Sequence, residues 1–350
     1  MDTLIARVNP LNPEPEIIEK AADILKNGGL VAFPTETVYG LGGNGLDPAA
    51  CGKIYEAKGR PSDNPLILHI SDIGEISRIV REIPPAARAC MDAFWPGPLT
   101  MVLKKTDAVP DLATGGLDTV AVRFPSNPAA RALIKASGLP IAGPSANSSG
   151  RPSPTAASHV FHALSGKIDM ILDGGECKVG IESTILDVSD KHAVILRPGF
   201  VTREMIEAVI GRIEIDASMG HIPDESFIPR APGMKYTHYS PEAEVILVSG
   251  GLSDVVKKIN LLACEDEKKG VKTGIMASSQ TKELYTCGTV LCVGDRSDIK
   301  TVAENLFGTL RRFDELGVSR IYSEVFEEDG CGMAVMNRLS KAAGYKCIKA

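Results

Sequence analysis

The chain has 350 residues, of which 44% are hydrophobic and 23% charged; its formal net charge is -6 and its isoelectric point is near 5.6. This length allows two domains of ordinary size with a substantial core in each, and the composition is typical of a soluble globular protein. The acidic balance argues against broad electrostatic binding to nucleic acid, which needs a basic face, but it is compatible with a local cationic pocket.

The first half of the chain predicts a mixed α/β fold, because helical and strand patterns alternate. The first helix is expected over 16–27. The second is expected over 47–57, where Asp47 can cap it and Pro48 takes its first position. Further helical segments are expected within 73–94 and over 128–137. Strands are expected over 30–35, 64–70, 99–105, 119–125, 139–145, 170–175, 183–189 and 192–199.

From about residue 211 the pattern changes. Residues 211–243 are rich in proline and keep no sustained period, which is typical of a linker with its own role. A second alternation follows, and it predicts a small, open, Rossmann-like doubly wound parallel sheet. We therefore expect a catalytic domain over 1–212, a linker over 213–242 and a second α/β domain over 243–350. In the second domain, strands are expected over 243–250, 271–278, 289–294 and 319–326, and helices over 252–264, 299–315 and within 332–343.

The N-terminal stretch, MDTLIARVNPLNPEPEI, has no apolar core of signal-peptide length. No apolar run approaches the roughly 18 residues that span a bilayer, so we expect a cytoplasmic protein with no membrane association. Cysteines form no C-x-x-C pair, and reduced thiols packed as small hydrophobic side chains are expected. The eight cysteines stand at positions 51, 90, 177, 264, 287, 292, 331 and 347.

The densest motif is KGRPSDNPLILH at residues 58–69. Lys58 and Arg60 place two cations two residues apart. Basic residues at the end of an exposed helix are one interpretation. The following proline-rich turn favours another, because an extended turn can aim both cations at phosphate oxygens. Asn64 and His69 add neutral polar groups that can orient a ligand, so the motif predicts a polyphosphate site beside a small polar substrate.

A glycine-rich motif, FPTETVYGLGGNG, occupies residues 33–45. It matches neither the dinucleotide fingerprint nor a Walker A loop, and a tight turn after a strand explains its glycines equally well. Thr35 stands at the end of the preceding strand, where ligands commonly bind in open α/β sheets. The motif is therefore a candidate binding loop.

Four further segments carry candidates. In IAGPSANSSGRPSPT, Ser145 and Asn147 directly follow a strand, although a surface loop explains this composition too. Arg123 lies near the end of a strand in TVAVRFP; if it is buried it needs an anionic partner, such as a carboxylate or a phosphate. Ser183 in GIESTILD and Arg197 in ILRPG are weak candidates by themselves. The sequence contains no H-E-x-x-H or G-x-S-x-G motif, so we expect neither a protein-held metal site nor a serine hydrolase triad.

Together these motifs resemble the threonylcarbamoyl-AMP synthases, the YrdC-like family in its long two-domain form. The resemblance runs in order through FPTETVYGLGGN, KGRPSDNPLILHI, AVRFP, GPSANSSGRPSPT, ESTILD and LRPG, and continues through HYSP into the C-terminal domain. One departure is Gly143, where the family often has alanine; we expect it to matter little. The resemblance implies a twisted α/β sheet with a large, concave, positively charged cavity.

The activity implied by the resemblance is the joining of L-threonine, bicarbonate or CO2, and ATP into threonylcarbamoyl-adenylate, with release of pyrophosphate. Other proteins then transfer the activated group to adenosine 37 of tRNA; direct tRNA binding is compatible with this but not required. Mg²⁺ held mainly through ATP phosphates is implied as the cofactor. By the family's pattern, Lys58, Arg60, Ser145 and Asn147 surround the phosphates and act in catalysis. The remaining ATP contacts would be Asn64, Thr119, Ser153, Arg197, His238 and Tyr239, and the threonine contacts would be Thr35, His69, Arg123, Gly143 and Ser183.

The linker suggests one more hypothesis. It carries Tyr236, His238 and Tyr239, and HYSP at 238–241 is expected to fold over the cavity as a lid; a passive tether is the alternative. Two rival functions stay open from the sequence. One is an RNA-binding module, disfavoured by the acidic charge. The other is a different carbamoyl-adenylate enzyme, which normally carries additional acyl-phosphatase and zinc-finger regions.

Overall fold

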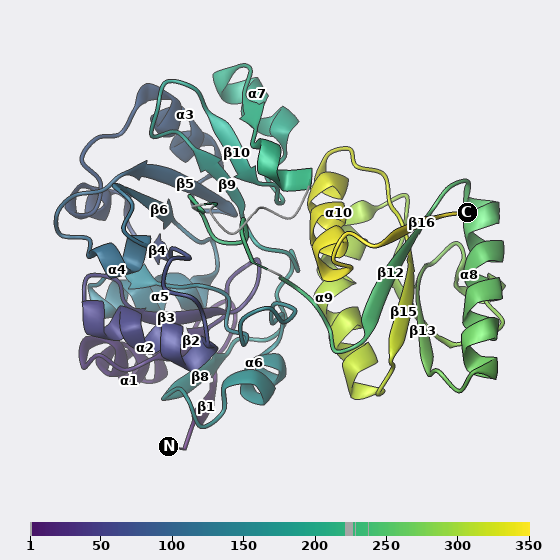
Figure 1. Ribbon diagram of the computed structural model, residues 1–350. Coiled ribbons are helices and arrows are strands. Elements are labelled where there is room, and N and C mark those ends of the chain that lie inside the picture. Colours follow the sequence, from purple (N-terminus) through teal and green to yellow (C-terminus); the bar gives the residue numbers. More distant parts are fainter. Residues whose placement is uncertain (1, 221–226, 228, 237) are drawn as a thin grey trace. The chain divides into compact units, whose positions relative to one another are not determined.

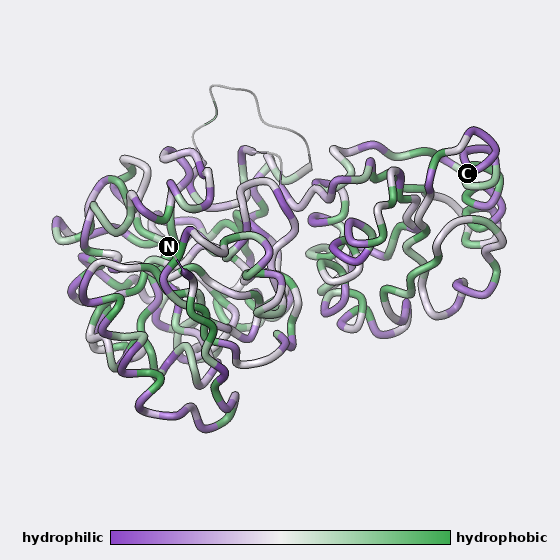
Figure 2. The backbone as a smooth tube through the Cα atoms, turned by 90° about the horizontal axis from the view of Figure 1, so that it is seen from below, coloured by the Kyte–Doolittle hydropathy of each residue, from purple (hydrophilic) through white to green (hydrophobic). Residues whose placement is uncertain are grey.

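The computed structural model describes residues 2–220, 227, 229–236 and 238–350 (Figure 1). The chain forms two compact units. The first contains the residues up to Ser149 together with Ser153–Tyr236, and the second contains Gly150–Pro152 and the chain from His238 to Ala350. In each unit hydrophobic segments run through the interior, while hydrophilic segments predominate in loops and exposed turns (Figure 2). No helix of the described residues is long and apolar enough to cross a membrane.

The first unit is built on one mixed sheet in the order β1-β8-β2-β3-β7-β4-β6-β5-β9-β10-β11. Its centre combines a parallel β4/β6 pair with antiparallel β5/β6 and β4/β7 pairs. The predicted mixed α/β class is thereby confirmed. The strands are β1 (Leu4–Arg7), β2 (Val31–Phe33), β3 (Gly40–Asn44), β4 (Ile67–His69), β5 (Leu99–Lys104), β6 (Thr119–Arg123), β7 (Ile141–Ala142), β8 (Met170–Asp173), β9 (Thr184–Asp187), β10 (Val194–Arg197) and β11 (Glu214–Ile215).

The helix that carries the basic motif begins and ends as its sequence predicts. The carboxylate of Asp47 accepts a hydrogen bond from the backbone of Ala49 (2.9 Å), and Pro48 is its first residue. Gly59 ends it in the left-handed region (φ 62°), which glycine adopts at little cost. The helices of this unit are α1 (Pro15–Lys26), α2 (Pro48–Lys58), α3 (Pro85–Phe94), α4 (Asp111–Thr114), α5 (Pro128–Ser137), α6 (Ala157–Leu164) and α7 (Arg203–Ile210), with 3-10 helices η1 (Ile73–Arg78) and η2 (Ala217–Gly220).

The two faces of this sheet bury different side chains, because successive residues of a strand point to opposite faces. In β6, Val120 and Val122 join the largest core cluster, whereas Ala121 joins a small cluster on the other face. That small cluster also contains two residues from the end of the first unit, Ala231 and Met234. Its strand residues are Ile67, Val102, Ala121, Ile185 and Leu196. We call these five strand residues the apolar floor.

The second unit is a five-stranded parallel sheet in the order β14-β13-β15-β12-β16, which confirms the predicted doubly wound domain. Helix α8 covers one face and α9 and α10 cover the other (Figure 1). The strands are β12 (Glu244–Ser249), β13 (Thr273–Ser278), β14 (Thr289–Gly294), β15 (Arg320–Glu324) and β16 (Cys347–Lys349), and the helices are α8 (Leu252–Lys268), η3 (Lys282–Leu284), α9 (Ile299–Glu315) and α10 (Cys331–Ala342).

Three expectations differ from the structure. The glycine-rich stretch was expected as a turn, yet Gly40–Asn44 forms β3, because glycines leave room for the Phe33 ring and Ile54 against the strand. The helical stretch 73–94 is split by Pro84 and Pro85 into η1 and α3. The prediction that all cysteines are reduced is wrong: Cys264 of α8 and Cys287 form a disulfide, with Cα atoms 5.4 Å apart. The six others are free, and Cys51, Cys90, Cys177 and Cys331 are buried as expected.

Candidate functional site

The side chain of Lys58 joins two predicted motifs. It is 3% exposed, and its Nζ donates to the carbonyl oxygens of Ser145 and Asn147, the latter at 2.5 Å. The backbone of Ser149 donates in return to the Lys58 carbonyl (2.8 Å). Burial lowers the pKa of Lys58 well below its ordinary value and Arg60 lowers it further, while Glu182 acts in the opposite direction. An exposed helix end is therefore excluded for Lys58, which is buried between α2 and the loop at 145–149.

Arg60 orders the turn that follows α2. Its Nε donates to the carbonyl oxygen of Asn64 (3.1 Å) and its Nη2 to that of Pro65 (2.9 Å). Asn64 itself is 1% exposed, and its Oδ1 has no hydrogen-bond partner among the described residues. A buried carbonyl oxygen left this way is costly unless a ligand or water supplies a donor. This unpartnered oxygen makes Asn64 a candidate binding group.

The loop around Ser145 also pairs with the glycine-rich motif. Ser145 forms an antiparallel bridge with Gly40, Leu41 donates to the Pro144 carbonyl (2.7 Å), and Ala146 donates to the Tyr39 carbonyl (2.8 Å). The three motifs that the sequence analysis identified separately therefore meet at one place. Thr35 is buried there, but its hydroxyl contacts Thr37 (2.8 Å) and donates to the Val38 carbonyl (2.6 Å), so it shapes the loop's own turn.

A row of polar side chains crosses the sheet on the face of the apolar floor. His69 of β4 pairs in register with Arg123 of β6, which pairs with Thr100 of β5. The Thr100 hydroxyl lies 2.8 Å from that of Ser183, which precedes β9. All four side chains are buried. Alternation along each strand puts them on the same face as the floor residues two positions away.

His69 stays neutral in this row. Burial and the adjacent Arg123 lower its pKa to about 3. Its ring meets the Phe33 ring edge-on, with centroids 5.9 Å apart, and its Nδ1 has no hydrogen-bond partner among the residues described. Gly143 packs directly against it: a Cβ added there would lie 2.8 Å from Nδ1. The expectation that glycine at 143 matters little stays a prediction, although an alanine methyl group there would make a close contact with the imidazole.

Arg197 contacts this row at Ser183. Its Nε and Nη2 both donate to the Ser183 carbonyl at 3.1 Å, and its Nη1 donates to the Pro232 carbonyl at 3.4 Å. Ser153 is also buried, and its hydroxyl donates to the carboxylate of Glu182. Thr119 begins β6, at the end of the strand opposite to Arg123. Because β4 and β6 are parallel and Ile67 pairs with Ala121, Thr119 and Asn64 lie at the same end of these two strands.

His238 and Tyr239 lie in the second unit. Tyr239 is 4% exposed, with its ring centroid 5.2 Å from that of Phe307 and the Arg338 guanidinium over it. Their roles in ATP binding stay predictions. Of the predicted linker, residues 221–226, 228 and 237 lie outside the described residues.

Comparison with known proteins places this site in a family. Residues 23–199 match the family model described as "Telomere recombination", and residues 201–344 match the "Threonylcarbamoyl-AMP synthase, C-terminal domain". Over 333 residues the chain is 49% identical to the threonylcarbamoyl-AMP synthase of Pyrococcus abyssi, covering 95% of both proteins. The chain belongs to the threonylcarbamoyl-AMP synthase family. The synthase of Bacillus subtilis is 47% identical over 337 residues, covering 96% of the chain and 95% of the relative.

Solved structures agree with this family. The crystal structure of the P. abyssi protein Sua5 complexed with L-threonine superposes with a TM-score of 0.93 at 48% identity, over 99% of this chain and 100% of that one. The Escherichia coli protein YciO, at 27% identity and a TM-score of 0.51, covers 56% of this chain and 96% of its own. This chain is therefore an enzyme of the long, two-unit form of the synthase family.

Three polar residues beside the candidate site residues were not predicted from the sequence. Glu36 lies in the glycine-rich motif, with its Oε1 2.7 Å from Nη2 of Arg123. Thr100 supports Ser183, and Glu182 accepts the hydrogen bond of Ser153. A signal for the two carboxylates was present, because each is an acidic residue directly beside a predicted site residue. Thr100 had no such signal, apart from being a polar residue within a predicted strand.

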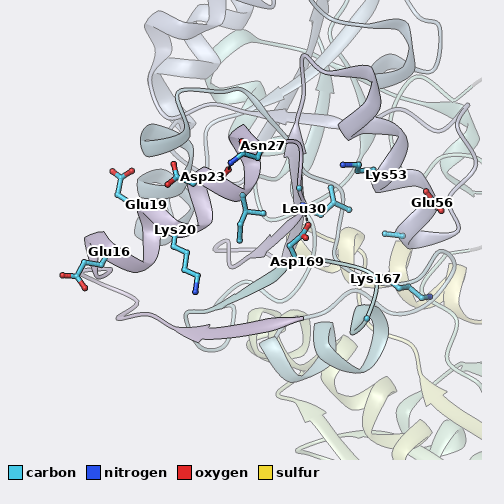
Figure 3. Close-up of a pocket in the computed structure, with 14 residues that line it drawn as sticks. Glu16, Glu19, Lys20, Asp23, Asn27, Leu30, Lys53, Glu56, Lys167 and Asp169 are labelled. Atoms are coloured by element: carbon cyan, nitrogen blue, oxygen red, sulfur yellow. Dashed lines mark hydrogen bonds between the residues drawn. The ribbon is translucent and has the colours of Figure 1, made fainter. Parts of the chain in front are cut away.

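A separate pocket lies between α1, α2 and the segment 166–169 (Figure 3). None of the predicted site residues lines it. Its wall carries five carboxylates against three lysines, which disfavours a polyphosphate. The carboxylates are Glu16, Glu19, Asp23, Glu56 and Asp169, and the lysines are Lys20, Lys53 and Lys167.

Proposed function

We propose that the protein is an L-threonylcarbamoyladenylate synthase, which joins L-threonine, bicarbonate or CO2, and ATP and releases pyrophosphate. The observation that carries this proposal is the near-full-length similarity to the P. abyssi synthase, one of whose solved structures is a complex with L-threonine. The buried arrangement of Lys58, His69 and Arg123 supports it, because it combines a cation beside a polar loop with a cation beside a neutral imidazole.

The reaction is an adenylylation, and we place the enzyme among the nucleotidyltransferases. The threonine amine condenses with bicarbonate, or with CO2, to give a carbamate. A carbamate oxygen attacks the α-phosphate of ATP, and pyrophosphate leaves. Such a displacement needs positioning and neutralisation of charge more than covalent help from the protein.

The phosphates are proposed to bind at the wall formed by Lys58, Arg60, Ser145 and Asn147. Burial disfavours the charged form of the Lys58 amine. A phosphate anion beside it would stabilise that form, since an opposite charge favours protonation. The rest of ATP is assigned to the end of the strands that carries Asn64 and Thr119 and to Ser153 and Arg197.

L-Threonine is proposed to bind at the other end of β4 and β6. Arg123 takes its carboxylate, because a guanidinium matches a carboxylate in a forked geometry. The neutral His69 and the hydroxyl of Ser183 face the same space as Arg123 from neighbouring strands. Thr35 and Gly143 complete the walls through the loop turn and the contact with His69.

Closure over the site is proposed to involve the end of the first unit. Ala231 and Met234 pack on the apolar floor, and Tyr236 donates a hydrogen bond to Asp63 in the basic motif. A segment anchored on that floor is suited to exclude water. The part assigned to HYSP itself stays a proposal.

The proposed adenylylation also implies a magnesium ion for ATP and partner proteins that use the product. No group of three His, Cys, Asp or Glu side chains that could hold a metal comes together in the described residues. We propose that Mg²⁺ is held mainly by phosphate oxygens, where it would neutralise their charge. A cytoplasmic location and delivery of the product to tRNA-modifying transferases are part of this proposal.

One assay tests the function. Pyrophosphate release is measured with ATP, threonine and bicarbonate, and each is omitted in turn; the proposal requires dependence on all three. Arg60→Ala should raise the KM for ATP, and Arg123→Ala the KM for threonine. Arg88→Ala, at an exposed arginine of α3, is the control and should change neither. Release that does not depend on threonine would contradict the proposal.

A further inference from the structure

The pair formed by Glu36 and Arg123 is buried but incompletely satisfied. Their side chains are 12% and 5% exposed, and Nη2 of Arg123 lies 2.7 Å from Oε1 of Glu36. Within the described part of the chain, neither oxygen of Glu36 nor Nε and Nη2 of Arg123 makes a hydrogen bond of good geometry. Buried ion pairs of this kind are costly unless further hydrogen bonds complete them. The pair therefore offers both a donor and an acceptor to a ligand.

We propose that Glu36 binds the ammonium group of L-threonine and accepts its proton, while Arg123 holds the carboxylate. This inference rests on the proposed function and adds a catalytic residue to it. An α-amino acid presents a positive and a negative group one carbon apart. The Glu36–Arg123 pair presents the opposite charges side by side, so the zwitterion enters a buried site without leaving any of its charges unpaired.

Other groups near the pair are less suited to take the proton. Burial of His69, and then the charge of the adjacent Arg123, lower the pKa of its ring and so oppose protonation. Cys177, in the segment after β8, is also close to both Glu36 and Arg123, but burial raises its thiol pKa to about 12, so it is not an acceptor without losing a proton first. Among these four neighbouring side chains, only Glu36 carries a carboxylate.

The step balances in atoms and charge. A proton passes from the threonine ammonium to the Glu36 carboxylate, which leaves a neutral amine and a carboxylic acid. The amine nitrogen then forms a bond to the carbon of bicarbonate, and water leaves, giving the carbamate that attacks ATP. Glu36 returns its proton to solvent after the product departs. The amine must be free for this attack, because an ammonium nitrogen has no lone pair.

A binding experiment separates this role from simple support of Arg123. Calorimetry on the full chain compares L-threonine with 2,3-dihydroxybutanoate, in which a hydroxyl replaces the ammonium group. Wild-type protein should bind threonine about tenfold more tightly or better, as expected for a lost charge-assisted hydrogen bond. Glu36→Gln should weaken the binding of threonine by a similar factor. It should leave the affinity for the hydroxy acid unchanged or higher. Equal losses for both ligands, or no loss for either, would overturn the proposal.

A kinetic experiment tests the proton transfer. Glu36→Gln should lower kcat by about 10²-fold, the lower range for a positioned general base. The loss should shrink as pH rises towards the pKa of the substrate's own amine, because solvent then removes the proton. A ratio of wild-type to variant rates that stays constant over this range contradicts the role. If wild-type protein shows no threonine-dependent pyrophosphate release, the proposed function fails instead. If Glu36→Gln does not fold, equal binding of threonine and the hydroxy acid by wild-type protein still overturns the inference.

Discussion

The side-chain nitrogen of Lys58 lies 2.5 Å from the carbonyl oxygen of Asn147, which comes 89 residues later in the chain. This contact joins the end of α2 to the loop after β7. The lysine is thus both a structural tie and a candidate phosphate ligand. Its lowered pKa follows from burial in this position, so a bound polyphosphate should change its protonation.

The first prediction concerns proton uptake when ATP binds. Phosphate oxygens beside Lys58 raise its pKa from the depressed value of the free protein. Uptake is expected in the pH window between the two pKa values, and calorimetry in buffers of different ionisation enthalpy measures it. Lys58→Met should abolish the uptake and weaken ATP binding by about tenfold or more. Lys53→Met, in the same helix but bonded to the Gly28 carbonyl, is the control. Unchanged uptake in Lys58→Met would refute the assignment.

The second prediction tests the close contact between Gly143 and His69. In Gly143→Ala the new methyl group would lie 2.8 Å from Nδ1 of the imidazole, so the ring must shift. The KM for threonine should rise about fivefold, since overpacking by one methyl group costs on the order of 1 kcal/mol, and the KM for ATP should not change. Gly308→Ala, where a Cβ meets nothing within 4 Å, should leave both values unaltered. An effect on ATP alone would show that residue 143 does not belong to the threonine side.

The third prediction concerns acid stability. The pKa of His69 is lowered to about 3 in the fold, below the roughly 6.5 of an unfolded chain. As pH falls below about 6.5 the unfolded state binds the proton first, so the folded state loses about 1.4 kcal/mol per pH unit from this residue until the pH nears the folded value. His69→Asn should show a shallower loss. Urea unfolding followed by fluorescence of Trp95, the chain's single tryptophan and a first-unit residue, measures this. Equal slopes would contradict it.

The sequence predicts local features of this structure well, but it does not predict contacts between residues that are far apart in the chain. Helix α2 was predicted because its cap and its terminal glycine are local signals, and the strands around the apolar floor because their hydrophobic runs are local too. The contact of Lys58 with the loop at 145–147 could not be predicted, since side-chain reach depends on the pairing of β3 with β7. The basic motif identified the residues but not their partners.

The misses have the same cause. Glu36 was part of a quoted motif, but its role depends on Arg123, 87 positions later, so only the fold makes them a pair. Cys264 and Cys287 lie 23 residues apart with no spacing signal, and their pairing follows from the packing of α8 beside the start of β14. Compositional expectation favoured reduced thiols, and tertiary proximity overrode it.

The fourth prediction concerns the contact between Asp63 and Tyr236. The Tyr236 hydroxyl donates to Oδ1 of Asp63, and Lys235 lies 3.3 Å from Oδ2. If this contact helps to close the site over ATP, Tyr236→Phe should raise the KM for ATP about two- to fivefold, as expected for one hydrogen bond, and leave the KM for threonine alone. Asp63→Asn should have a similar effect. The double variant should cost less than the sum of the two changes. Strictly additive effects would show that the two residues act separately.

The most direct test of the central claim is the identity of the product. The protein is incubated with ATP, L-threonine and ¹³C-bicarbonate, and the nucleotide products are resolved by mass spectrometry. The account predicts threonylcarbamoyl-adenylate carrying one labelled carbon, formed together with pyrophosphate, and its absence with Lys58→Met. Pyrophosphate release without a labelled threonine adduct, or label in a carbamoyl-adenylate that lacks threonine, would contradict it.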